Sequence, residues 1–144
     1  MKNLFKIISF LFIAFQVFTG ASQEVFGKWK TIDDNTGEAK SILEIYERNG
    51  LVFGKVVEIL NKDRQDALCD QCEGADENKP ILGMEIIRGL EKDGDEYNGG
   101  KILDPESGKL YKCYITLEDP NKLKVRGFIG FSLLGRTQYW HRIE

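Results

Sequence analysis

Hydrophobic and polar residues alternate along most of the chain after Val25, and this two-residue period predicts β-strands. Short runs rich in Ile, Val, Tyr and Phe recur with turn residues between them, and no segment has a convincing helical period. The strongest turn signals are Asn49-Gly50 and Asp93-Gly94, because these residues tolerate positive φ. The predicted strands cover residues 27–33, 40–48, 51–60, 83–91, 95–103, 109–117, 122–130 and 135–143.

The alternation is clearest in the last strands. In 109–117, Tyr111, Cys113 and Ile115 share one face, and in 122–130 the core face ends at Ile129. One face therefore meets a core and the other meets water, as in an antiparallel sheet, and short connections keep consecutive strands adjacent. Eight such strands can close into a barrel that holds side chains or one small ligand. We predict an all-β fold, a single antiparallel up-and-down β-barrel of about eight strands.

Residues 1–21 have the three-part layout of a secretory signal peptide. Two lysines come first, an apolar run follows from about Ile7 to Phe18, and small residues end the segment at Ala21. The run is too short to span a bilayer comfortably, and an interfacial anchor that stays attached is the alternative. We expect export to the periplasm or the extracellular space, with residues 22–144 forming the barrel domain and no membrane span after cleavage.

The charge balance argues against nucleic acid as a partner. Removing residues 1–21 leaves 144 − 21 = 123 residues, with 20 − 2 = 18 basic and 23 acidic side chains, a net charge near −5. The basic residues are scattered singly, whereas phosphate recognition needs a basic face. The length suits one domain with one core.

Cys69-Asp70-Gln71-Cys72 is the most distinctive short motif. In an exported protein it meets an oxidising environment, which favours a disulfide between Cys69 and Cys72. The acidic neighbours disfavour a reactive thiolate and hence a redox pair. A bond from either cysteine to Cys113, or a zinc site completed by Cys113 and His141, is an alternative. We expect Cys113 to be a small buried core residue and expect no metal.

The connection at residues 61–80 is longer than compact domains usually contain. A disulfide within it would hold its shape, and it is either a lid over one barrel mouth or a tethered surface loop. Two other connections begin with an aspartate, Asp33 and Asp104, followed by Thr36-Gly37 and Ser107-Gly108. Because the EF-hand spacing is absent, side-chain-capped turns explain these segments better than calcium loops.

Several short sequence motifs of the mature chain resemble those of one bacterial family. They are Gly27-Lys28-Trp29, Cys69-x-x-Cys72 with Lys79-Pro80-Ile81-Leu82-Gly83, Gly99-Gly100-Lys101-Ile102-Leu103-Asp104-Pro105, Leu123-Lys124-Val125-Arg126-Gly127 and Gly135-Arg136-Thr137-Gln138 with Trp140. Together they look like the exported proteins grouped as DUF2147. The resemblance covers nearly all of the mature chain and implies a small exported protein without an established activity.

Gly-x-Trp in the first strand and an arginine in the last are also similar to the lipocalin and calycin pattern. That resemblance implies that Trp29 closes one end of the barrel and that Arg136 or Arg142 packs across its ring. An arginine over an indole face gains cation–π energy of about 0.5–2 kcal/mol and shields the barrel end from water. We expect this role to be structural.

Candidate catalytic groups are few, so we expect a binding protein rather than an enzyme, without a cofactor. His141 is the only histidine, no Gly-x-Ser-x-Gly elbow occurs, and the carboxylates fall mostly in turns. A hydrolase that acts with a pair of carboxylates is a less favoured hypothesis. The leading hypothesis is a small apolar or amphipathic ligand inside the barrel; the alternative is a packed structural or interaction module of the cell envelope. The candidate lining residues are Phe53, Val57, Ile86, Tyr111, Ile115 and Val125.

Overall fold

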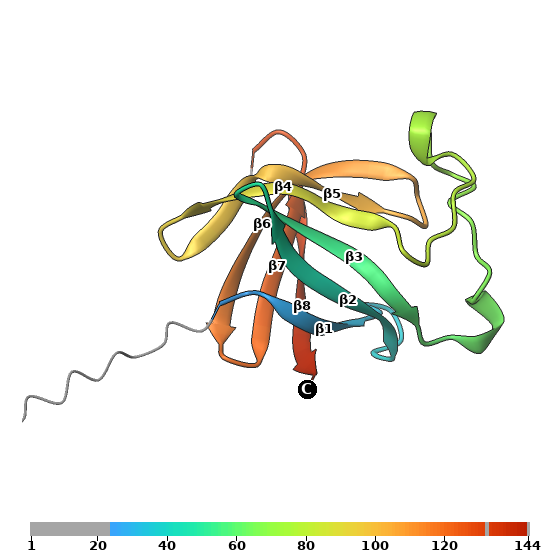
Figure 1. The fold of residues 1–144 in the computed structure, drawn as a ribbon, viewed down its shortest axis with the longest axis horizontal. Coiled ribbons are helices and arrows are strands. Elements are labelled where there is room, and N and C mark those ends of the chain that lie inside the picture. Colours follow the sequence, from blue (N-terminus) through green and yellow to red (C-terminus); the bar gives the residue numbers. More distant parts are fainter. Residues whose placement is uncertain (1–23, 132, 144) are drawn as a thin grey trace, which may run out of the picture.

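The computed structural model describes residues 24–131 and 133–143, and within them the chain forms eight strands and two short 3₁₀-helices (Figure 1). The expected signal peptide at 1–21 lies outside the described residues. The strands are β1 (Gly27–Ile32), β2 (Ala39–Arg48), β3 (Leu51–Ile59), β4 (Glu85–Asp93), β5 (Glu96–Asp104), β6 (Lys109–Asp119), β7 (Lys122–Phe128) and β8 (Gly135–Ile143). The helices are η1 (Lys62–Arg64) and η2 (Gly74–Asp76).

The strands form a closed antiparallel barrel in sequence order, β1 to β8. β1 also pairs with β8, with Lys28 opposite Ile143, Trp29 opposite Arg142 and Lys30 opposite His141. The predicted up-and-down barrel is therefore confirmed, and every predicted strand boundary lies within two residues of the observed one. Because the sheet closes on itself, β1 and β8 do not present open edges.

The inner face is apolar and contiguous. Alternate residues of each strand point inward and pack into one buried cluster, which includes both tryptophans. Gly54 and Gly100 occupy inward positions where the neighbouring strand β4 comes close; a Cβ on Gly100 would lie 2.2 Å from the Arg88 carbonyl oxygen. The inward-facing side chains in this cluster include Trp29, Leu43, Ile45, Val52, Val56, Ile87, Leu90, Tyr97, Cys113, Ile115, Leu123, Val125 and Trp140.

The two ends of the barrel differ in their connections. The end where β2, β4 and β6 finish has two-residue turns at 49–50, 94–95 and 120–121. Asn49 and Gly50 both have positive φ, as expected for the Asn-Gly hairpin. The other end carries the longer connections at 33–38, 60–84, 105–108 and 129–134. The predicted turn chemistry is present there: Asp33 accepts hydrogen bonds from two backbone amides, and Asp104 accepts from Glu106 N and the Ser107 hydroxyl.

The short-turn end is closed by Trp29 and Arg142. Trp29 is fully buried, and its indole N–H donates to the Val25 carbonyl at 2.8 Å. The guanidinium carbon of Arg142 lies 4.3 Å from the centroid of the Trp29 ring. The other candidate cation, Arg136, lies near the opposite end of β8 and pairs with Asp34. Arg142, and not Arg136, therefore covers the ring.

Arg142 also joins three segments by hydrogen bonds. Its Nε donates to the Pro120 carbonyl at 2.8 Å, and its two Nη groups donate to the carbonyls of Phe26 and Glu24 at 2.7 and 2.8 Å. The planar fork thus ties the last strand to the segment before β1 and to the β6–β7 turn. A lysine ammonium cannot match this arrangement.

The predicted core face of 122–130 is wrong at its end. β7 stops at Phe128, and Ile129 is exposed. The chain leaves the sheet because Gly130 adopts φ +66° and Ile129 N donates to the Leu134 carbonyl, which closes a loop. The alternation of apolar and polar residues in the sequence thus continues to Ile129, one residue beyond the end of β7.

Replacing Arg142 with lysine should lower the free energy of unfolding by about 1–3 kcal/mol, because the charge is kept but the fork of hydrogen bonds is lost. Arg136→Lys is the matched control, since Arg136 is exposed and makes an ion pair with Asp34; its effect should stay below about 1 kcal/mol. Urea denaturation of both variants measures the difference. Equal effects would contradict the closing role of Arg142.

Candidate functional site

The segment 61–80 has a defined shape that its sequence builds locally. Leu68 and Pro80 form an isolated antiparallel bridge, Cys69 N donates to the Lys79 carbonyl, and Asn78 N donates to the Cys69 carbonyl. The disulfide between Cys69 and Cys72 is present, as predicted. Both half-cystines are buried although the residues around them are mostly exposed. The segment is thus a small closed loop.

This loop is seated on the β5–β6 turn. A Cβ on Gly108 would lie 1.9 Å from the Gln71 carbonyl oxygen, so the two backbones touch at a point that admits only glycine. Cys69 Sγ lies 3.5 Å from the Pro105 carbonyl oxygen. Leu103 is buried in the same cluster as both half-cystines. The buried disulfide therefore packs against the barrel at its long-connection end.

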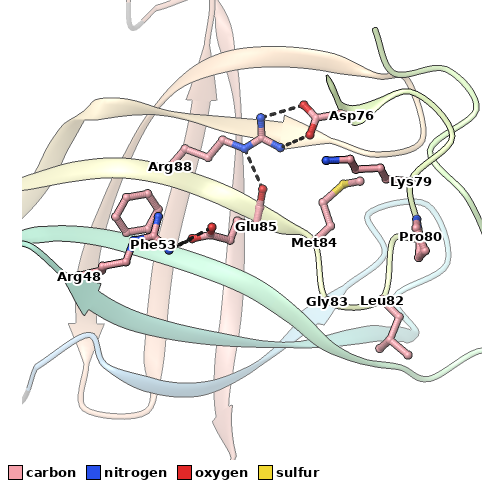
Figure 2. A pocket seen from close by; sticks show the side chains of 10 residues that line it. All are labelled: Arg48, Phe53, Asp76, Lys79, Pro80, Leu82, Gly83, Met84, Glu85 and Arg88. Carbon is pink, nitrogen blue, oxygen red and sulfur yellow. Dashed lines mark hydrogen bonds and ion pairs between the residues drawn. The ribbon is translucent and has the colours of Figure 1, made fainter. Parts of the chain in front are cut away.

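A pocket of about 570 Å³ lies between this loop and strands β3 and β4. Figure 2 shows that its walls come from three parts of the chain: the loop, the start of β4 and the β2–β3 hairpin. We call it the loop pocket. It is lined by Arg48, Phe53, Asp76, Lys79, Pro80, Leu82, Gly83, Met84, Glu85 and Arg88.

One wall of the loop pocket is the ion pair between Arg88 of β4 and Asp76 of the loop. The two Nη groups of Arg88 donate to the two Asp76 oxygens at 2.9 and 3.1 Å. The Nε of Arg88 donates to the Glu85 carbonyl at 2.8 Å (Figure 2). The hydrogen bonds from Arg88 are the main reason that the pKa of Asp76 is lowered. Because all three nitrogens of the fork are engaged, Arg88 is held in one orientation.

A second cluster, centred on the Glu85 side chain, adjoins this wall. Arg48 donates from one Nη to both oxygens of Glu85, at 3.2 and 3.1 Å, and Tyr46 donates its hydroxyl to Glu85 at 2.6 Å. Burial opposes the charge on Glu85, but the hydrogen bonds from Tyr46 and Arg48 together outweigh it and lower the pKa. Burial and the Glu85 bond raise the pKa of Tyr46 to about 12. Arg48 also lies 4.0 Å above the Phe53 ring.

The charges around the loop pocket do not cancel. Three cations, Arg48, Lys79 and Arg88, face two carboxylates, which gives 3 − 2 = +1. Both arginines are paired with carboxylates, whereas Lys79 lies in no ion pair with another described residue. The rest of the lining is apolar, from Phe53, Pro80, Leu82 and Met84. Lys79 is close enough to Asp76 to help lower the pKa of that carboxyl, so the pocket combines an apolar contact surface with a net excess of one positive charge.

The six residues expected to line the barrel interior are divided by the structure. Ile86, Ile115 and Val125 are buried in the internal cluster. Phe53 pairs with Tyr46 on the outer face, where the two rings stack with centroids 6.2 Å apart, and it lines the loop pocket instead. Val57 and Tyr111 are partly buried and fall outside that cluster. Their role in holding a ligand stays a prediction.

Cys113 and His141 are not brought together as a zinc site would require. Cys113 points inward from β6 and is buried, and burial raises the pKa of its thiol to about 12. His141 is exposed on the outer face of β8, opposite Lys30. Among residues 24–131 and 133–143, no group of three or more His, Cys, Asp or Glu side chains is arranged to hold a metal ion. In the same part of the chain, no helix is long and apolar enough to cross a membrane.

Residues 27–142 match the family described as an uncharacterized protein conserved in bacteria, DUF2147. The chain belongs to the DUF2147 family. Among solved structures it is similar to the protein HP1028 from the human pathogen Helicobacter pylori, which is described as belonging to the lipocalin family. The two chains share 19% sequence identity over 84% of each, with a TM-score of 0.74, so the similarity establishes a lipocalin-like fold. No curated protein matches the chain.

Sequence reasoning missed most of the loop pocket. Arg48, Glu85 and Arg88 sit in strands as ordinary outward-facing charges, and Lys79 stands beside Pro80 in a loop of mixed composition. The available signal was the length of the 61–80 connection together with its two cysteines. That signal marks a shaped loop but does not say which strands the loop faces.

Asp76→Asn should remove about 1 kcal/mol of stability at pH 7, because the neutral amide cannot form the charged pair with Arg88. The pKa of Asp76 is lowered from 3.8 in the folded protein. The pair therefore stabilises the fold above that value and loses its effect as the pH falls through the lowered pKa. Denaturation at pH 7 and in strong acid should show the variant converging with the wild type. Glu77→Gln, at the exposed neighbouring carboxylate, is the control, and an equal loss there would contradict the role of the pair.

Proposed function

We propose that this DUF2147 protein is an exported binding protein that holds a small amphipathic molecule carrying one negative charge in the loop pocket. The observation that carries this proposal is the ammonium group of Lys79, which lies in no ion pair with another described residue, beside an apolar lining where both arginines are already paired. A carboxylate or phosphate would pair with Lys79, and an apolar chain would contact Phe53, Leu82 and Met84. The volume of about 570 Å³ falls within the range of roughly 300–1,000 Å³ common for small-molecule sites.

The pocket is also built to keep its shape before a ligand arrives. The disulfide closes the loop, Gly108 lets it sit against the β5–β6 turn, and the Arg88–Asp76 pair joins it to β4. Preformed walls reduce the entropy lost when a ligand binds. The lipocalin-like fold of the chain supports a binding role in general, since barrels of this size leave loops at one end free to form sites.

Export is supported by the disulfide, because such bonds persist in oxidising compartments and are rare in the cytosol. The layout of residues 1–21 supports the same compartment. We propose that the mature protein begins at Ser22.

A packed envelope module without a ligand is the second candidate. It is favoured by the internal cluster, in which side chains from every strand, including Trp29 and Trp140, form one contiguous core. A barrel of this strand number is just wide enough for its side chains to fill. Titration with amphiphiles distinguishes the two candidate functions. A packed module binds none of them, whereas a binding protein with a ligand in the loop pocket binds at least one.

Isothermal titration of the mature protein with decanoic acid, decanol and decylamine tests the pocket. The acid should bind most tightly, because it alone combines a chain with a negative charge at neutral pH. Lys79→Gln should weaken binding of the acid about fivefold, equivalent to about 1 kcal/mol for one partly screened charge pair, and should leave the alcohol unaffected.

Lys92→Gln is the matched control, because Lys92 is exposed on β4 near the short-turn end of the barrel. Equal weakening by Lys92→Gln would show that the acid responds to net charge and not to the pocket. Absence of binding by all three amphiphiles would favour the packed module instead.

Expression of the full chain with its own N-terminus tests export. The protein should be recovered outside the cytoplasm, and its intact mass should match residues 22–144 with one disulfide. Recovery of a chain that retains residues 1–21 in the membrane pellet would instead support an interfacial anchor.

A further inference from the structure

The connection between β7 and β8 exposes four large apolar side chains to solvent. The exposed fractions are 61% for Ile129, 81% for Phe131, 88% for Leu133 and 68% for Leu134. Such residues scattered singly are common on protein surfaces, whereas a contiguous group marks an interaction site. We call residues 129–131 and 133–134 the apolar loop. In Figure 1 it projects beyond the barrel from the ends of β7 and β8.

The apolar loop is a folded feature of the hairpin. Ile129 N donates to the Leu134 carbonyl at 2.9 Å, and Leu134 N donates to the Phe131 carbonyl at 3.0 Å. Gly135, at the start of β8, packs so closely on β7 that a Cβ would lie 2.3 Å from the Gly127 carbonyl oxygen. These contacts hold the apolar side chains outward in water.

A row of basic residues crosses the outer face of the barrel directly beneath the apolar loop. Lys101 of β5 stands opposite Lys112 of β6, and Lys112 stands opposite Phe128, the last residue of β7. In the next row, Arg126 of β7 stands opposite Tyr114 of β6. Like charges directly opposite each other destabilise a sheet. The Lys101–Lys112 pair is thus a cost to the fold unless a negative surface meets it.

Three carboxylates at this end of the barrel are engaged, whereas the exposed carboxylates of residues 61–80 lie in no ion pair with a described residue. Asp34 pairs with Arg136 at 2.8 Å, Glu106 pairs with Lys40, and Asp104 accepts hydrogen bonds within its own turn. Within the described part of the chain, neither Lys101 nor Lys112 lies in an ion pair. Although the mature chain carries a net charge near −5, the Lys101–Lys112 row therefore presents local positive charge that no ion pair within the described residues offsets.

We propose that the apolar loop and the Lys101–Lys112 row form a docking surface for an anionic lipid bilayer. The loop is a protrusion rather than a groove, so it needs a deformable apolar medium and not a shaped partner. Phe131, Leu133 and Leu134 enter the boundary between headgroups and acyl chains, and the lysines lie at the level of the phosphates. Aromatic Phe128 and Tyr114 lie between the basic residues, an arrangement suited to the interface.

Co-sedimentation of the mature protein with vesicles tests this surface. The probes are vesicles of phosphatidylcholine alone and vesicles in which about a third of the lipid is phosphatidylglycerol. The wild type should sediment with the anionic vesicles, and much less with neutral vesicles or in high salt. Lys101→Glu with Lys112→Glu should reduce binding to anionic vesicles about tenfold or more, since each lysine near an anionic surface contributes several-fold.

Phe131→Asp with Leu133→Asp should abolish sedimentation with both kinds of vesicle, and because both side chains already lie in water the variant should keep the thermal midpoint of the wild type. Leu68→Asp is the control, since Leu68 is an exposed leucine in another loop; it should bind like the wild type. The proposal is overturned if the wild type leaves anionic vesicles unbound, or if the Phe131 and Leu133 changes leave binding intact. It is also overturned if those changes instead convert a dimer to a monomer, because the loop would then meet a second copy of the chain.

Discussion

The closure of the barrel depends on the contact between Arg142 and Trp29. β8 and β1 are paired at only three positions, Lys28 to Lys30, and among the other ladders only the bulged β3–β4 ladder has as few. The guanidinium strengthens this seam by bonding to carbonyls on both sides of it and by covering the indole. Charge-assisted hydrogen bonds to fixed carbonyls are roughly twice as strong as neutral ones, so a single side chain can compensate for a short ladder. The segment at residues 24–26 is held in place by the same group.

Closure of the short-turn end limits which surfaces of the molecule remain accessible to a ligand or partner. The turns there have two residues each, and the barrel interior above them is occupied by a continuous apolar cluster. Surface for recognition is therefore left to the opposite end, where the connections are longer, and to the outer faces of the strands. The loop pocket and the apolar loop both arise from connections at that end, one after β3 and one after β7. The two ends of the barrel thus differ: one is closed by Trp29 and Arg142, and the other carries the long connections that form the loop pocket and the apolar loop.

Much of this architecture follows from the sequence, because strand periodicity and turn chemistry are local. The alternation in 109–117 and the Asn49-Gly50 turn specify their elements without reference to distant residues. Cys69 and Cys72 are close enough in sequence for their bond to be expected. Arg142 could not be separated from Arg136 by sequence, because both lie in the last strand and only the closed register shows which one reaches Trp29.

The surfaces that carry the proposals could not be read from the sequence, because they are assembled across strands. Lys101 and Lys112 are eleven residues apart and look like two isolated surface lysines until the register sets them opposite each other. The loop pocket likewise joins Arg48 to Lys79 and Arg88 through the path of the 61–80 loop. Phe53 illustrates the same limit. Its position in an alternating strand fits either face, and a shift of the count by one residue moves it from the core to the outer wall. The bulges in the ladders between β2, β3 and β4 produce such shifts, and side-chain direction there depends on tertiary pairing and not on the local pattern.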